Sequence, residues 1–227
     1  METTCTICHF HSCPAVKRLS LKQQELLAKN STEVKYKKGN LVFMQNAFAN
    51  NVAYLTSGLV KKHMTGLNGK QQIIEIIKAP SYIGIPTTLG NNINQYSVTS
   101  LTESSMCMID LNVFKQMCCE NAMFSYEIIQ EMCRKELKHF CSCFNRTQKN
   151  AKGLLAETLV YFSCTVFNTN SFSIPLSRSE IADLINVSRE QVCRVLSEFH
   201  HDGIIDIKGK EIIIKNSDLL KKISQNG

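Results

Sequence analysis

The stretch that decides the fold spans residues 177–196 and reads SRSEIADLINVSREQVCRVL. It contains two segments with the apolar spacing of short helices, and Asn186 lies between them. Ile181 and Ile185 put one apolar face on the first segment. Asn tolerates the backbone of a sharp turn, and Ser188 is a natural N-cap for the second segment. The pattern therefore predicts a helix-turn-helix.

The second of these helices is predicted to have a buried back and an exposed front. The residues expected at its back are Val192, Val195, Leu196 and Phe199. The residues left facing away from the core are Arg189, Glu190, Cys193 and Arg194. Arg and Glu near the start of such a helix are the side chains that read base edges in the major groove. We therefore expect a recognition helix for double-stranded DNA.

A β-hairpin is predicted directly after this helix. The apolar runs 204–207 and 211–214 flank the turn Lys208-Gly209-Lys210. Lysines at a hairpin tip reach phosphates easily. The hairpin would be the wing of a winged helix-turn-helix domain over residues 149–227, with Lys208 and Lys210 on the DNA backbone.

Residues 20–110 predict a short helix followed by short strands. Ser20 and Gln23 can form a capping box at the start of the helix. Turn signals such as those at residues 38–40 and 66–69 then separate short apolar runs. Short strands at this spacing are typical of an antiparallel β-roll or barrel.

Residues 111–148 contain neither proline nor glycine and predict a long helix. One apolar stripe recurs along it at steps of three or four residues and consists of Tyr126, Ile129, Cys133, Leu137, Phe140 and Phe144. This spacing is close to that of a coiled coil. We expect the stripe to pair with its copy in a homodimer; the alternative is that it packs on its own β-domain.

Composition bounds the class of protein. The 227 residues are 44% hydrophobic and 20% charged, which is ordinary for a soluble chain. No apolar run has the roughly 18 residues of a membrane helix, and the N-terminus lacks a signal-peptide pattern, so we expect no membrane association and a cytoplasmic location. The net charge of +7 comes mostly from the N-terminal half, so it adds little to the DNA-binding argument. The sequence has no phosphate loop, HExxH motif or nucleophile elbow, so no enzyme is expected.

The order of β-roll, long helix and winged helix-turn-helix resembles the Crp/Fnr superfamily of transcription regulators over nearly the whole chain. The resemblance implies an α+β protein with a cysteine-rich segment (1–19), a cyclic-nucleotide-binding-like β-roll (20–110), a dimerisation helix (111–148) and the DNA-binding domain. Ser188-Arg189-Glu190-x-x-x-Arg194 matches the recognition core of the family. There the arginines read guanines and the glutamate accepts from a cytosine amine. RNA polymerase is a further partner for a regulator of this kind.

The identity of two recognition-helix residues separates the branches of this superfamily. The Fnr branch often has a small apolar residue where Arg189 stands and a serine where Cys193 stands, so this chain is closer to the Crp branch. The resemblance then implies a palindromic site of TGTGA-like half-sites, inverted about one helical turn apart, rather than TTGAT.

A cysteine cluster opens the chain and suggests a signal. Cys5, Cys8 and Cys13 are close enough in sequence to surround one metal centre that takes its fourth ligand from elsewhere. Fnr-type oxygen sensors, which this arrangement resembles, hold a [4Fe-4S] cluster with such a group and one distant cysteine at the end of the β-roll. Cys107 falls on that position. The resemblance implies sensing of oxygen, nitric oxide or redox state, although the gap before Cys13 is one residue shorter than in the best-known Fnr pattern.

Other cofactors remain open from the sequence. His9 and His11 would suit a Cys/His zinc site, and His63 or His139 could serve as an axial haem ligand; a regulator without a cofactor is the remaining alternative. Cyclic AMP is not expected, because Ile85 and Tyr96 stand where the family carries its ribose-binding Glu and phosphate-binding Arg. Seven further cysteines are expected to be small apolar fillers on helices: Cys118, Cys119, Cys133, Cys141, Cys143, Cys164 and Cys193.

Overall fold

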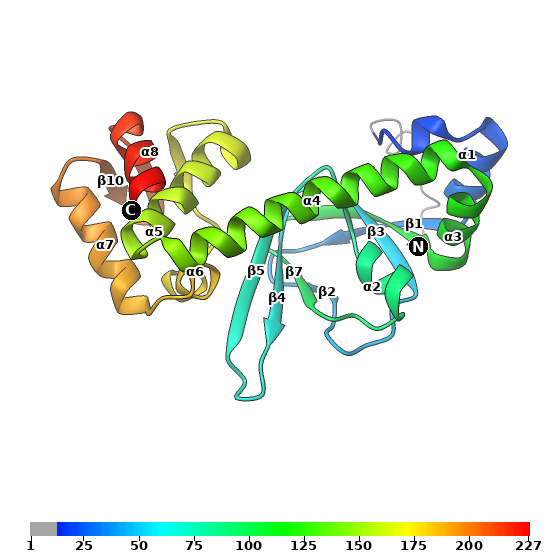
Figure 1. The fold of residues 1–227 in the computed structure, drawn as a ribbon, viewed down its shortest axis with the longest axis horizontal. Helices are drawn as coiled ribbons and strands as arrows, with labels where there is room; N and C mark the ends of the chain where they lie inside the picture. Colours follow the sequence, from blue (N-terminus) through cyan, green and yellow to red (C-terminus); the bar gives the residue numbers. More distant parts are fainter. Residues whose placement is uncertain (1–12) are drawn as a thin grey trace. The chain divides into compact units, whose positions relative to one another are not determined.

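The computed structural model describes residues 13–227 and divides into two compact units, with the boundary between Leu137 and Lys138. A β-roll, a long helix and a winged helix-turn-helix follow one another along the chain (Figure 1). This order confirms the predicted fold class.

The first unit is a β-roll of two four-stranded antiparallel sheets. One sheet has the order β1-β8-β3-β6 and consists of β1 (Ser31–Tyr36), β8 (Ser104–Asp110), β3 (Asn51–Ser57) and β6 (Ser81–Ile83). The other has the order β2-β7-β4-β5 and consists of β2 (Leu41–Phe43), β7 (Ser97–Ser100), β4 (Leu59–Thr65) and β5 (Gln71–Lys78). The short helix α2 (Ile85–Gly90) follows β6.

Helices cover one face of the first sheet. They are the short turn η2 (Val16–Arg18), α1 (Leu21–Lys29), α3 (Leu111–Glu120) and the start of α4 (Ala122–Gln148). Tyr54 of β3 lies opposite Cys107 on β8 and opposite Tyr82 on β6, so these three residues form a row on one face. That row belongs to the same buried core as Phe114 and Phe124.

Helix α1 begins as the sequence predicts. The Ser20 hydroxyl accepts from the Gln23 N–H at 3.4 Å, and the Gln23 amide oxygen accepts from the Ser20 N–H at 3.1 Å. Both halves of the predicted capping box are therefore present.

The prediction of one uninterrupted helix over residues 111–148 is wrong. The backbone leaves helical geometry at Asn121, with φ −130° and ψ 100°, and α3 and α4 lie on either side. The Asn121 side chain accepts from the Phe124 N–H at 2.9 Å and donates to the Arg18 carbonyl at 3.0 Å. Asn121 thus caps α4, and this local hydrogen bonding breaks the helix without proline or glycine.

The second unit surrounds the helix-turn-helix. Its elements are α5 (Ala151–Tyr161), the π-helical turn η3 (Phe162–Phe167), β9 (Ser171–Ser173), α6 (Arg178–Ile185), α7 (Arg189–His201), β10 (Ile205–Lys208), β11 (Glu211–Ile214) and α8 (Ser217–Asn226). The strands form one antiparallel sheet in the order β10-β11-β9. Helix α8 packs against α5.

None of the helices in residues 13–227 combines the length and the apolar character needed to cross a membrane.

Candidate DNA-binding interface and cysteine site

The turn between α6 and α7 is fixed by local hydrogen bonds. Asn186 ends α6 in the left-handed region, with φ 57° and ψ 49°. Ser188 then caps α7: its hydroxyl accepts from the Gln191 N–H at 3.2 Å, and the Gln191 side chain accepts from the Ser188 N–H at 3.1 Å. The capping box starts α7 at Arg189. The predicted base-reading side chains Arg189, Glu190 and Arg194 therefore lie on the first turns of α7.

Helix α7 buries its back and exposes its front. The four apolar residues expected to face the core, Val192, Val195, Leu196 and Phe199, are all buried. Arg189, Glu190, Cys193 and Arg194 are exposed, and Ser188 is exposed at the N-cap. The packing therefore presents these five side chains together on one surface.

Glu190 is held as an ionised acceptor at the start of α7. A hydrogen bond from its own backbone N–H, supported by the Ser188 hydroxyl and the Arg189 charge, lowers the pKa of its carboxyl. An ionised carboxylate only accepts hydrogen bonds, so Glu190 can pair with an amine and not with a carbonyl.

Arg194 is anchored by a contact that the sequence analysis missed. Its guanidinium lies 3.0 Å from one oxygen of Glu198, and the other oxygen of Glu198 lies 2.6 Å from the ammonium of Lys152 on α5. Lys152 is the main cause of a lowered pKa at Glu198, and Arg194 contributes. The contact between Arg194 and Glu198 could have been predicted from their i,i+4 spacing in the sequence. The contact of Glu198 with Lys152 could not, because Lys152 comes from a distant part of the chain.

The wing is a tight hairpin with a lysine on each side of its glycine. Lys208 of β10 pairs with Glu211 of β11, and Gly209 at the tip has φ +63°, a conformation that glycine adopts without strain. Lys208 and Lys210 are both exposed. They are therefore available to a polyanion.

Two of the four predicted metal ligands are described by the structure. Cys13 and Cys107 both have zero exposure and lie in the same core, although they are far apart in sequence. The Cys13 sulfur is 3.1 Å from the Tyr82 hydroxyl. Cys5 and Cys8, with His9 and His11, lie outside the described residues. Thiolate sulfur is the ligand type that zinc and Fe–S clusters use, so both side chains are of the right chemical kind.

The expectation that the other cysteines are apolar fillers is wrong for six of the seven. Cys119, Cys133, Cys141, Cys143, Cys164 and Cys193 are exposed, and Cys118 is half-buried. All six lie on outward faces of helices or of the turn that follows α5, where a small apolar side chain fills no cavity.

The two positions at which the family carries its cyclic-nucleotide ligands are occupied here by an apolar and an aromatic residue. Ile85 is buried in the core that contains Cys13. The Tyr96 hydroxyl hydrogen-bonds the Gly84 backbone and the Thr87 side chain, and burial raises its pKa to about 12. The Lys62 ammonium lies 5.1 Å from the centre of the Tyr96 ring and 3.1 Å from Glu75, with which it forms an ion pair.

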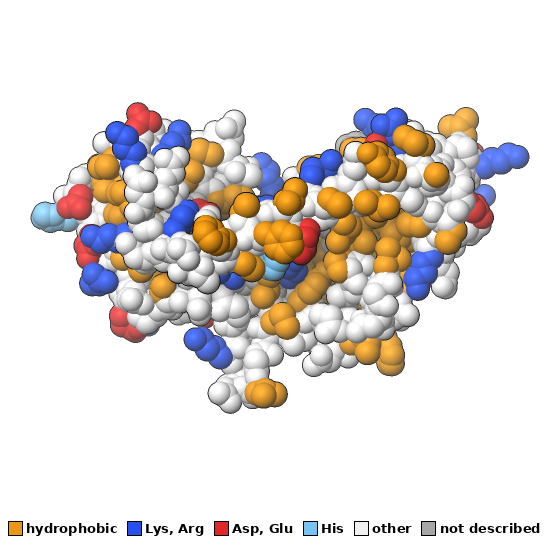
Figure 2. All heavy atoms as spheres, in the orientation of Figure 1, with side chains coloured by type: hydrophobic (Ala, Val, Ile, Leu, Met, Phe, Trp, Pro, Cys, Tyr) orange, Lys and Arg blue, Asp and Glu red, His pale blue; other side chains and the backbone are white. Residues whose placement is uncertain are grey.

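Helix α4 has two apolar faces. Phe124 and Ile128 pack into the core of the β-roll. The predicted stripe is exposed, with exposed fractions of 57% for Ile129, 64% for Leu137, 59% for Phe140 and 64% for Phe144, and Cys133 is exposed among them. Figure 2 shows hydrophobic side chains along the course of α4. Within each of the two units, the described residues therefore leave their part of the stripe uncovered.

These features define a class of protein: DNA-binding transcription regulators in which a β-roll is linked by a helix to a winged helix-turn-helix. Residues 33–121 match the cyclic nucleotide-binding domain family, and residues 154–223 match the Crp-like helix-turn-helix domain family. The chain belongs to the Crp/Fnr family of transcription regulators. Neither these matches nor the site indicates an enzyme.

Individual relatives agree with this assignment. The chain is 24% identical over 227 residues to a probable transcriptional activator of Rhizobium leguminosarum bv. viciae, which covers 97% of this chain and 92% of the relative. It is 25% identical over 187 residues to the transcriptional activator protein FnrA of Stutzerimonas stutzeri; the match covers 80% of this chain and 75% of FnrA. The structure of FixK2 from Bradyrhizobium japonicum has the same fold, with a TM-score of 0.76, 19% identity, and coverage of 85% of this chain and 96% of FixK2.

Proposed function

We propose that the protein is a homodimeric regulator that senses oxygen, nitric oxide or redox state through an Fe–S cluster held by Cys5, Cys8, Cys13 and Cys107. The observation that carries the proposal is the burial of Cys13 and Cys107 in one core, on the side of the β-roll that packs against α4. The similarity to the transcriptional activator protein FnrA supports the regulator part of this proposal.

The chemistry of the two described thiols supports a metal-bound state. A metal ion deprotonates a coordinating thiol outright, so both cysteines could serve as thiolate ligands. A bound cluster of the [4Fe-4S] type would supply the group with which oxygen and nitric oxide react. The contribution of the chain is to exclude water from Cys13 and Cys107 and to keep both beside the helix that carries the dimer stripe.

The dimer proposal rests on the exposed stripe of α4. Five large or medium apolar side chains in a row on one helix face are costly to leave in water, and pairing with a second copy would cover them: Ile129, Cys133, Leu137, Phe140 and Phe144. A two-fold dimer presents two copies of α7 to DNA, which requires two inverted half-sites.

DNA reading is assigned to the exposed front of α7. Arg189 and Arg194 would donate to guanine O6 and N7, and the ionised Glu190 would accept from a cytosine amine. Ser188 and Cys193 lie on the same surface, and Lys208 and Lys210 of the wing would contact phosphates. We propose TGTGA-like half-sites, because the residues at positions 189 and 193 resemble those of the Crp branch more than those of the Fnr branch.

Cyclic AMP is not the proposed signal. A cyclic nucleotide needs a carboxylate for the ribose and a cation for the phosphate, and the buried Ile85 and the bonded phenol of Tyr96 offer neither. An added cyclic nucleotide should leave the DNA affinity unchanged.

The sensing proposal is tested on protein purified without oxygen. Absorption spectrum, iron and acid-labile sulfide are measured before and after air is admitted, in wild type, Cys107→Ala and the control Cys119→Ala, whose cysteine is exposed. We expect about four irons per chain in wild type and in Cys119→Ala, a visible band that bleaches in air, and loss of iron in Cys107→Ala. A colourless protein, a zinc protein or a haem Soret band would contradict the cluster and leave the DNA-binding regulator in place.

A further inference from the structure

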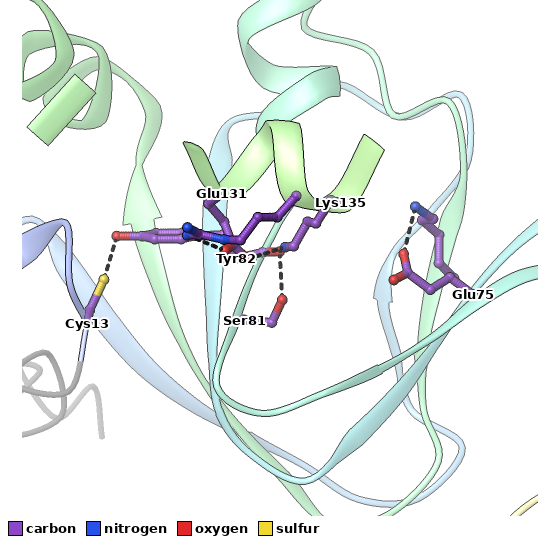
Figure 3. A network of polar contacts seen from close by, with 8 residues as sticks. Cys13, Glu75, Ser81, Tyr82, Glu131 and Lys135 are labelled. Atoms are coloured by element: carbon purple, nitrogen blue, oxygen red, sulfur yellow. Dashed lines mark hydrogen bonds and ion pairs between the residues drawn. The ribbon is translucent and has the colours of Figure 1, made fainter. Parts of the chain in front are cut away.

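A buried network around Tyr82 joins Cys13 to helix α4 (Figure 3). Tyr82 is in β6, the last strand in the order of its sheet, next to β3. Its hydroxyl is 3.1 Å from the Cys13 sulfur, and its carbonyl accepts from the Lys135 ammonium at 2.5 Å. One residue therefore contacts both Cys13 and α4.

The hydroxyl end of Tyr82 lies in the core. Its ring is buried, 4.8 Å from the Tyr54 ring and 6.0 Å from the Phe114 ring, measured between centroids. A buried hydroxyl that loses its hydrogen-bond partner cannot exchange it for solvent. A change at the Cys13 sulfur therefore forces Tyr82 either to move or to remain unpaired.

The carbonyl end of Tyr82 transmits such a movement to α4. Lys135 lies on α4 and also forms an ion pair of 3.4 Å with Glu131, one turn earlier on the same helix. The Ser81 hydroxyl is a second, longer donor to the same carbonyl, at 3.4 Å. A charged donor at short distance makes the stronger of the two bonds, so displacement of the Tyr82 backbone acts mainly on Lys135.

We propose that Tyr82 is a positioning residue that couples the Cys13 sulfur to the stability of helix α4. The inference deepens the proposed function, because it takes Cys13 as a sensing thiol and α4 as the helix that must be ordered for the dimer. It assigns Tyr82 and Lys135 a role in transmission and not in ligation.

Amide hydrogen exchange of α4 in the full-length protein tests this coupling. Four proteins are compared, each after iron has been removed: wild type, Cys13→Ala, Tyr82→Phe and the double variant. Cys13→Ala leaves the Tyr82 hydroxyl buried and unpaired, so exchange near Glu131 and Lys135 should rise about fivefold, the effect of one buried hydrogen bond. In the double variant both partners are gone, and exchange should return close to that of Tyr82→Phe alone.

Two further variants separate coupling from a general loss of stability. Lys135→Met removes the other end of the link, so Cys13→Ala should have no further effect on α4 in that background. Tyr36→Phe removes a half-buried hydroxyl in a different core and should leave the effect of Cys13→Ala intact. An equal effect of Cys13→Ala in the wild-type and Tyr82→Phe backgrounds, or no effect in either, would overturn the proposal.

Iron analysis of the same preparations before iron removal keeps the two proposals distinct. Absence of iron in the anaerobic wild type overturns the cluster but not the coupling, because the exchange comparison uses metal-free protein. Iron in the wild type together with identical exchange in all backgrounds overturns the coupling alone.

Discussion

At the scale of single residues, the chemistry concentrates on the first turns of α7. Glu190 is kept ionised by backbone N–H donation, and Arg194 is oriented by Glu198. Side chains with fixed charge and orientation lose less conformational entropy on binding than freely rotating ones, which favours affinity.

Glu190→Gln tests the assignment of the cytosine reader. The substitution keeps the shape of the side chain but adds donors, so the preference for cytosine at one position should fall by about 1–3 kcal/mol. Affinity for half-sites is measured with single base-pair variants at fixed salt. An unchanged base profile would contradict the assignment.

Lys208→Ala is the matched control for that experiment. A phosphate contact carries no base information, so all sequences should be bound more weakly by a similar factor. The slope of log affinity against log salt should fall by about one for each half-site, and so by about two for a dimer on a palindrome.

The exposed front of α7 could be predicted from the sequence, and its support could not. Helical periodicity places Arg189, Glu190 and Arg194 away from the core, and the structure agrees. The bridge from Glu198 to Lys152 joins two helices, so no local pattern reveals it. The exposure of Cys119, Cys141, Cys143 and Cys164 was missed because cysteine is usually buried, whereas Cys193 was placed on the exposed front of α7.

At the scale of elements, the tight turn before α7 depends on one left-handed residue. Asn186 has φ 57°, a region that costs most other side chains about 1–2 kcal/mol and costs glycine nothing.

Asn186→Ala should therefore lower the melting temperature of the full-length protein by a few degrees, at about 2–4 °C per kcal/mol. Asn186→Gly should lower it less. Thermal unfolding followed by circular dichroism compares the two, and an alanine variant as stable as the glycine variant would contradict a strained turn.

The stripe of α4 makes a second prediction at this scale. Leu137→Ala should raise the dissociation constant of the dimer by about tenfold or more, as for a central interface side chain, and should leave the monomer folded because Leu137 is already exposed. Sedimentation velocity without oxygen measures it. The neighbouring Glu136→Ala is the control. An equal change of the dissociation constant in both variants would contradict the proposal that the stripe forms the dimer interface.

The elements themselves were largely readable, with instructive exceptions. Period and turn signals predicted the β-roll, the capping box of α1, both helices of the helix-turn-helix and the wing. The break at Asn121 was missed because asparagine also occurs inside exposed helices, so its presence alone does not reveal a helix end. Strand β9 is too short to have a pattern of its own and depends on pairing with β11.

At the scale of the whole molecule, function depends on connections between distant parts of the chain. Cys13 meets Tyr82 across 69 positions of the sequence, and Tyr82 meets Lys135 across 53. A sequence can supply each residue type but not these pairings, which follow from the register of the sheet and the packing of α4.

The measurement that tests the account most directly is DNA binding by the full-length protein before and after exposure to air. A palindrome of two TGTGA half-sites is titrated without oxygen, and iron and visible absorbance are recorded on the same sample. The account predicts that affinity falls at least about tenfold as the absorbance bleaches, because loss of the dimer removes one of two recognition helices. Equal affinity with and without air would contradict control of DNA binding through the cysteine site.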